Sequence, residues 1–172
     1  MRQIILLVTL IISNSSLIQS QTSVKNLGYG HHENSGASTR CTGAQLSLSR
    51  VADDVAAGQR GVTFAFTNTS SSPCTLSGSP GFVMLNKDGR PVRGAHVEKD
   101  AGPAQVVKLL PGGKAWFMIT YGACGAGGTG RCPTSAKVRI TAPGTRRAFV
   151  LREQLDPYRG RVNVTSVQSE QP

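Results

Sequence analysis

The sequence predicts an all-β fold, an antiparallel β-sandwich of about eight or nine strands with two disulfides. From residue 41 onward, short runs of β-branched and aromatic residues alternate with clusters of Gly, Pro, Asn and Ser at roughly ten-residue spacing. Four cysteines follow a stretch that is typical of an export signal, and an even number of cysteines in an exported chain indicates a disulfide framework.

Residues 1–20 are predicted to be a secretory signal peptide, because a short charged start precedes the apolar run 4–12 and a polar stretch follows it. That run is too short to cross a bilayer, which takes about 20 residues, and no later segment is apolar enough. Residues 21–40 are expected to form a flexible leader, residues 41–167 the β-sandwich domain and residues 168–172 a tail. We therefore expect a secreted or periplasmic, extracytoplasmic protein without a transmembrane segment.

The four cysteines are Cys41, Cys74, Cys124 and Cys132, and they allow three disulfide pairings. We favour Cys41–Cys74 together with Cys124–Cys132, the second of which closes a short glycine-rich loop. The spacing of neither pair is that of a zinc knuckle, which disfavours a four-cysteine zinc site.

Two segments, 45–51 and 61–67, alternate apolar with polar residues and predict half-buried strands. Their inward-facing side chains are expected to be Leu46, Leu48, Val51, Val62, Phe64 and Phe66. Further strands are predicted at 74–76, 82–85, 137–140, 147–151 and 161–167, and a turn at 86–89.

Residues 105–110 and 114–121 flank Pro111-Gly112-Gly113 and predict a hairpin. The second arm contains an apolar run from Trp116 to Ile119, which predicts a strand buried on both faces with Trp116 in the core. The only helical turns expected are at 52–57 or 151–155.

One block of motifs resembles a known family. It includes Cys41, Phe64-x-Phe66-x-Asn68, the run from Ser71 to Leu76 with Pro80-Gly81, and then Asp88-Gly89, Leu110-Pro111-Gly112-Gly113, Ala115-x-Phe117 and Cys124. Over roughly residues 41–167 the chain is similar to the bacterial exported family catalogued as domain of unknown function 4232. The resemblance implies a secreted, Ig-like β-sandwich with the first two cysteines paired, and it supplies no catalytic motif. One departure is Ser79, where the family usually has an aromatic residue.

Several motifs suggest chemistry that their surroundings do not support. Gly125-x-Gly127-x-x-Gly130 fits the dinucleotide fingerprint, but no helix is expected after it, so we predict a loop and no cofactor. A serine nucleophile would need a base, and His96 is the only histidine inside the domain. His31 and His32, beside Glu33, are weak metal candidates in the leader. Glu98 and Asp100 are a carboxylate pair that is expected to lie in a solvated loop.

The strongest functional signal is charge. The formal net charge is +10, and removal of the predicted signal takes away only Arg2, which leaves +9. Such a surplus attracts polyanions, and the arginine fork binds phosphate or carboxylate well. The candidate anion contacts are Arg139, Arg146, Arg147, Arg152 and Arg161. The low aromatic content, 5%, argues against a single-stranded nucleic-acid platform.

The favoured hypothesis is therefore a non-catalytic binding or structural module of the bacterial envelope. Its partner would be an anionic envelope polymer or another surface protein. The alternatives are a secreted hydrolase and a metal-handling protein that uses the leader histidines.

Overall fold

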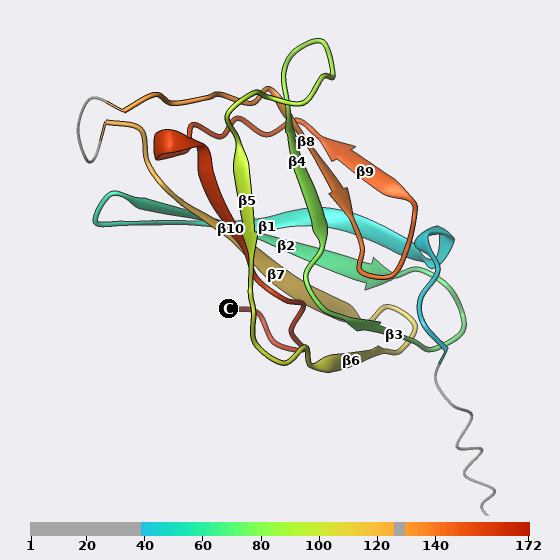
Figure 1. Ribbon diagram of the computed structural model, residues 1–172. Coiled ribbons are helices and arrows are strands. Elements are labelled where there is room, and N and C mark those ends of the chain that lie inside the picture. The colour runs from blue at the N-terminus through green and yellow to red at the C-terminus, as the bar shows by residue number, and fades with distance from the viewer. Residues whose placement is uncertain (1–38, 126–129) are drawn as a thin grey trace, which may run out of the picture. The chain divides into compact units, whose positions relative to one another are not determined.

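The computed structural model describes residues 39–125 and 130–172, and within them the fold is built almost entirely of β-strands (Figure 1). The strands are β1 (Leu46–Ala56), β2 (Gln59–Asn68), β3 (Cys74–Ser77), β4 (Gly81–Leu85), β5 (His96–Lys99), β6 (Val106–Leu109), β7 (Lys114–Gly122), β8 (Lys137–Thr141), β9 (Ala148–Leu151) and β10 (Arg161–Val164). Two short 3₁₀ helices, η1 (Gly43–Gln45) and η2 (Tyr158–Gly160), are the helical elements of the described residues.

The strands form three sheets. The largest has the order β1-β2-β7-β10-β5, a second has the order β4-β8-β9, and β3 pairs with β6. All strand pairs are antiparallel except β5 and β10, which run parallel. The mostly antiparallel all-β prediction is thus confirmed, whereas the expectation of purely antiparallel pairing was wrong. The structure also has one strand more than the upper end of the predicted number.

The core draws side chains from all three sheets. Val62, Phe64 and Phe66 of β2 are at most 3% exposed, as predicted. Thr63 and Ala65 between them are buried as well, so β2 is buried on both faces and the half-buried strand expected there was wrong. The ring of Phe66 lies 5.1 Å from that of Phe117 on β7 and 6.0 Å from that of Phe149 on β9. These aromatic contacts join the five-stranded and three-stranded sheets through one hydrophobic cluster.

A β-bulge explains the main error in β1. The register to β2 shifts between Arg50 and Ala52, so the alternation of faces is interrupted there. Leu46 is buried as predicted, but Val51 is 40% exposed. The strand continues to Ala56, so the helical turn suggested at 52–57 is wrong.

The predicted hairpin between β6 and β7 is also wrong, because β6 pairs with β3 in a different sheet. The turn between them is held instead by Asn68, whose backbone exchanges hydrogen bonds with Gly112 and Gly113. In β7 the buried side chains alternate, and Trp116 is only partly buried and stands outside the core cluster. The apolar run from Trp116 to Ile119 therefore led to a wrong prediction, because only one face of β7 is fully buried.

Other segments are more ordered than expected. Residues 96–99 form a strand although charged residues predicted a loop there. Arg40, at the end of the expected leader, makes a parallel bridge to Thr75. Residues 152–155 are not helical, and Leu155 is buried in the core. Gln168, in the expected tail, bridges to Trp116.

Both favoured disulfides form, Cys41–Cys74 and Cys124–Cys132. The first lies in the core, where Cys41 is 4% and Cys74 0% exposed, whereas Cys124 is exposed at the surface. Among the described residues there is no helix with the length and apolar character needed to span a membrane. The predicted signal peptide, and the leader up to residue 38, lie outside the described residues.

Candidate functional site

The parallel pairing of β5 and β10 brings two distant segments together. His96 is in register with Arg161, and the two strands run parallel. The residues that lead into the two strands therefore lie side by side at the same end of the strand pair. These residues are Arg93-Gly94 before β5 and Arg159-Gly160 before β10. Their backbones touch, because a side-chain carbon added to Gly160 would overlap the carbonyl oxygen of Gly94.

The end of the disulfide loop supplies a third segment. Cys132 is bonded to Cys124, and Arg131 directly precedes it. Gly130 lies against the ring of Tyr158, the first residue of η2, and leaves no space for a side chain. The disulfide and this contact together place Arg131 beside η2.

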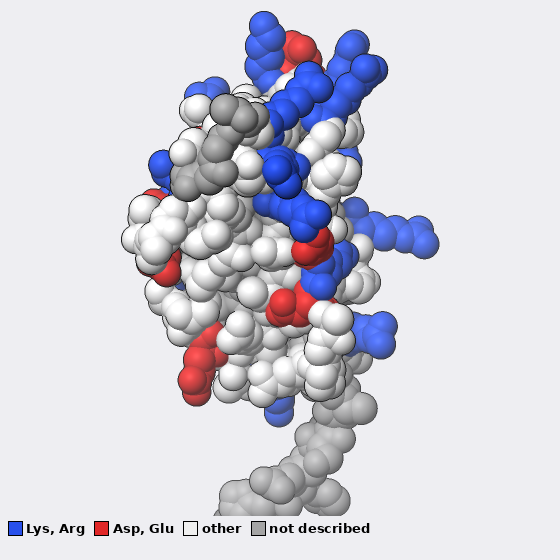
Figure 2. All heavy atoms as spheres, turned by 60° about the vertical axis from the view of Figure 1, so that its left-hand side comes forward, with Lys and Arg blue, Asp and Glu red and all other residues white. Residues whose placement is uncertain are grey.

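The three segments line an open hollow of about 260 Å³ formed by Arg93, Gly94, Arg131, Pro133 and Arg159, here called the arginine pocket. Arg93 also lines a neighbouring hollow that contains Arg90. Figure 2 shows Lys and Arg gathering toward the upper end of its view, the end at which Figure 1 shows the β4–β5 connection.

The pocket arginines have no acidic partner in the part of the chain that the structure describes, where the ion pairs belong to Arg50 and Arg161. The guanidinium of Arg159 lies 5.2 Å from the ring centre of Tyr158. Arg159 has a φ of 53°, the left-handed backbone region that residues other than glycine seldom adopt. The site therefore presents three positive charges with no compensating carboxylate on its walls.

The arginines predicted from the sequence are divided between the sheets. Arg139, Arg146, Arg147 and Arg152 lie on or beside β8 and β9, whereas Arg161 begins β10. Arg147 donates to the carbonyl oxygen of Gly43 at 3.4 Å and lies over the ring of Phe149. Arg161 lies 3.9 Å from a carboxylate oxygen of Glu98. Four of the five residues therefore lie on or beside the paired strands β8 and β9, and Arg161 lies on the other sheet.

Sequence reasoning missed the arginine pocket because its residues are far apart along the chain. Arg93, Arg131 and Arg159 meet only through a parallel strand pair and a disulfide loop. The sequence offers one weak indication of the pocket, which is that each of these arginines stands next to a glycine, and Arg131 also next to a cysteine.

The histidines do not form a site in the described residues. His96 is exposed on β5, and no hydrogen bond joins it there to a serine or a carboxylate. No group of three His, Cys, Asp or Glu side chains between residues 39 and 172, the gap at 126–129 excepted, is arranged to hold a metal ion. The weak candidates His31 and His32 lie outside the described residues.

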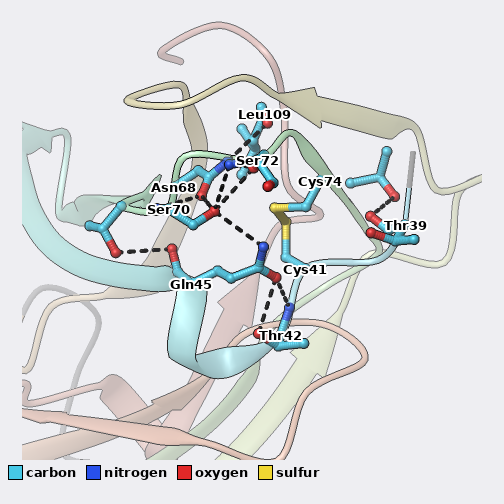
Figure 3. The surroundings of a disulfide bond; sticks show 11 residues. Thr39, Cys41, Thr42, Gln45, Asn68, Ser70, Ser72, Cys74 and Leu109 are labelled. Carbon is cyan, nitrogen blue, oxygen red and sulfur yellow. Dashed lines mark hydrogen bonds between the residues drawn. A yellow bond between two sulfur atoms is a disulfide. The ribbon is translucent and has the colours of Figure 1, made fainter. Parts of the chain in front are cut away.

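The serine-rich turn after β2 supports the core disulfide (Figure 3). Asn68 is fully buried, and its amide donates to the carbonyl oxygens of Ser72 and Leu109 at 2.8 and 3.2 Å. Its side-chain oxygen accepts from the amide and the hydroxyl of Ser70. Gln45 donates to that same hydroxyl. Because these polar groups satisfy one another, the turn has a structural role beside the Cys41–Cys74 bond.

A second charged group lies at the β1–β2 side. Arg50 pairs with Asp53 and with Glu153, the latter at 2.9 Å. Its hydrogen bond to Asp53 raises the pKa of the Arg50 guanidinium above its usual value. Burial, followed by the nearby charge of Asp156, raises the pKa of Tyr121 above the usual tyrosine value. Since these charges are mutually paired, this group offers less to an external anion than the arginine pocket does.

The glycine-rich loop contains the fragment that fits a dinucleotide fingerprint, of which residues 126–129 lie outside the described part. After Gly130 the described chain runs without a helix into β8. A helix N-terminus, which that fingerprint needs to hold a pyrophosphate, is therefore missing from the residues described there.

Comparison with the curated proteins and with the solved structures found no match. A family model does match residues 41–168, which is most of the chain. The chain therefore belongs to the family described as domain of unknown function 4232 (DUF4232).

Proposed function

We propose that the protein is an exported, non-catalytic binding module of the bacterial envelope that contacts anionic surface material through its arginine pocket. The observation that carries this proposal is the convergence of Arg93, Arg131 and Arg159 on one hollow without a carboxylate among the lining residues. Positive charges in a concave site focus the field and raise the local concentration of anions.

The scaffold is proposed to be an Ig-like β-sandwich. Its two layers would be the five-stranded sheet and the β4-β8-β9 sheet, whose side chains share one core. In such a sandwich the connections between strands gather at the two ends, and one end is free to bind. The arginine pocket is built from connections of this kind.

Export is supported by two features. The first 20 residues have the pattern of a secretory signal. Both cysteine pairs form disulfides, which persist in oxidising compartments outside the cytoplasm. In that setting the available anions include wall polymers and lipid headgroups.

The proposal is tested by retention on a dextran sulfate column with two triple variants of equal charge. One variant replaces Arg93, Arg131 and Arg159 by Gln, and the other replaces Arg139, Arg146 and Arg152 by Gln. We expect the pocket variant to elute at clearly lower salt, because its charges act together on one polymer segment. Thermal unfolding of both variants checks that the fold is retained.

Retention of the unmodified protein alone decides nothing, since any strongly basic protein adheres to such a column. Equal elution of the two triple variants would show that attraction follows total charge. That result would contradict binding through the arginine pocket.

A further inference from the structure

We infer that the arginine pocket is a phosphate site, which takes the phosphate group of a free phosphate, a lipid headgroup or a phosphodiester polymer. This inference rests on the proposed function and names the chemical class of its ligand. The walls are Arg93, Arg131 and Arg159, with Gly94 and Pro133 between them.

The number of arginines selects phosphate over carboxylate. A guanidinium presents a planar fork of donors that fits two oxygens of an anion. One carboxylate has two oxygens and a single charge, so one fork satisfies it. Free phosphate or a phosphate monoester offers at least three free oxygens and nearly two charges, which lets it accept from forks on several sides. A phosphodiester has two free oxygens and one charge, but a polymer or a membrane presents many of them side by side, so several forks can each take one. Three converging arginines therefore match the tetrahedral anion.

The three arginines are held at their backbones before any ligand arrives. Gly160 packs against the carbonyl of Gly94, which ties the Arg159 segment to the Arg93 segment. The Cys124–Cys132 bond and the contact between Gly130 and Tyr158 hold the Arg131 segment. Binding to a preorganised site loses less conformational entropy, which favours affinity for a small anion.

The surroundings leave space for a group attached to the phosphate. All three arginines are exposed, and the neighbouring hollow shares Arg93 and adds Arg90, Pro91 and Val92. A phosphate in the pocket can therefore remain joined to a larger molecule that extends over this second hollow. The cationic Arg90 beside it suits a chain with repeated negative charges.

The test is a titration of the purified, disulfide-bonded protein with inorganic phosphate, followed by NMR of the arginine Nε–Hε groups. We expect saturable shifts of a few arginine signals, which disappear in the Arg93→Gln, Arg131→Gln and Arg159→Gln variants. Each of these variants should bind phosphate at least about tenfold more weakly, because charge-assisted hydrogen bonds are lost. Acetate at the same ionic strength should bind at least about tenfold more weakly than phosphate.

Two further variants distinguish the contribution of the arginine's planar donor fork from that of its positive charge. Arg60→Gln removes an exposed charge on β2 that does not line the arginine pocket, and it should leave phosphate affinity within about twofold. Arg131→Lys keeps the charge but loses the fork, and it should still lose most of the affinity. The inference is overturned if Arg60→Gln weakens binding as much as the pocket variants, or if acetate binds as tightly as phosphate.

Three arms identify the source of the phosphate group. Inorganic phosphate, a soluble phosphodiester oligomer and phosphatidylglycerol vesicles are each added to the protein and to Arg131→Gln. The source of the phosphate group is the ligand that binds the unmodified protein most tightly and whose binding is lost in Arg131→Gln. If none of the three loses affinity in Arg131→Gln, the phosphate site is wrong. Retention on dextran sulfate that still depends on the pocket would then leave the proposed function standing.

Discussion

Arg159 combines a strained backbone with a side chain that we propose to bind anions. Its φ of 53° lies in the region that costs a residue with a Cβ about 1–2 kcal/mol, and Asn tolerates this region better than most residues. Such strain persists where the surrounding structure enforces it, and it is concentrated at functional sites. Here the enforcing contact is that of the next residue, Gly160, with Gly94.

We predict that Arg159→Asn and Arg159→Gln both lose phosphate binding but differ in stability. Both variants give up the contact with Tyr158, and only Asn relieves the left-handed backbone. The Asn variant should therefore be more stable than the Gln variant by about 0.5–1 kcal/mol. Urea unfolding measures the free energy, and the phosphate titration measures the binding.

A Gln variant as stable as the Asn variant would show that the backbone at this position bears no strain. Arg152→Asn and Arg152→Gln are the matched control pair, because Arg152 has no positive φ. These two should have the same free energy of unfolding.

At the scale of single residues, the sequence predicted burial well where alternation is unbroken. Val62, Phe64 and Phe66 are buried because β2 lies between β1 and β7 and these side chains belong to the common core, while the bulge lies in β1. Val51 was mispredicted because a bulge shifts the register beside it, and a bulge is set by tertiary pairing. The disulfide loop could be predicted, but the pocket that its Arg131 joins could not, because the other two arginines come from remote segments.

Among the elements, the parallel pair of β5 and β10 decides where the site lies. Residues 96–99 are charged or polar apart from one valine, a pattern that does not distinguish a strand from a solvated loop. They form a strand because β10 supplies the hydrogen-bond partners on one side. Sequence patterns describe one strand at a time, so this pairing and its direction were not predictable.

Gly94 and Gly160 should respond very differently to the same substitution. Both have a positive φ, 79° and 73°, but only Gly160 meets the opposite backbone. Gly94→Ala should cost about 1–2 kcal/mol from the backbone conformation alone. Gly160→Ala should cost at least about 2 kcal/mol more, because the two segments must also move apart. Thermal or urea unfolding measures both.

Phosphate titration of the same variants adds a second measurement. Gly160→Ala should weaken phosphate binding because Arg159 moves away from Arg93, while Gly94→Ala should retain most of it. Equal losses of stability in the two variants would mean that the backbones of these segments are not in close contact.

For the molecule as a whole, the two disulfides differ in depth. Cys41–Cys74 lies in the core beside buried Asn68, whereas Cys124–Cys132 closes a loop at the surface. The chain-entropy model gives roughly 4 kcal/mol for the longer loop and roughly 2.5 kcal/mol for the shorter one. Loss of the core sulfurs also leaves a cavity, which adds to the cost.

We predict that removing the surface disulfide mainly weakens phosphate binding, whereas removing the core disulfide mainly weakens folding. Cys124→Ala/Cys132→Ala should remain folded but bind phosphate at least about tenfold more weakly, because Arg131 is no longer held. Cys41→Ala/Cys74→Ala should lose more stability and, where still folded, keep its affinity. Circular dichroism during urea unfolding and the phosphate titration measure the two effects. Unchanged affinity in the first variant would show that the surface disulfide does not position Arg131.

The place of β10 in the chain also determines when the site can exist. During synthesis the chain appears N-terminus first, so β1, β2 and β7 can pair while β10 is still unmade. The pocket needs η2 and β10 docked against β5, a contact between segments far apart in sequence, and such contacts form slowly. The arginine pocket is therefore a late product of folding. If the chain is exported unfolded, as the proposed signal implies, it carries all of its positive charge inside the cell but has no assembled site there with which to bind phosphates.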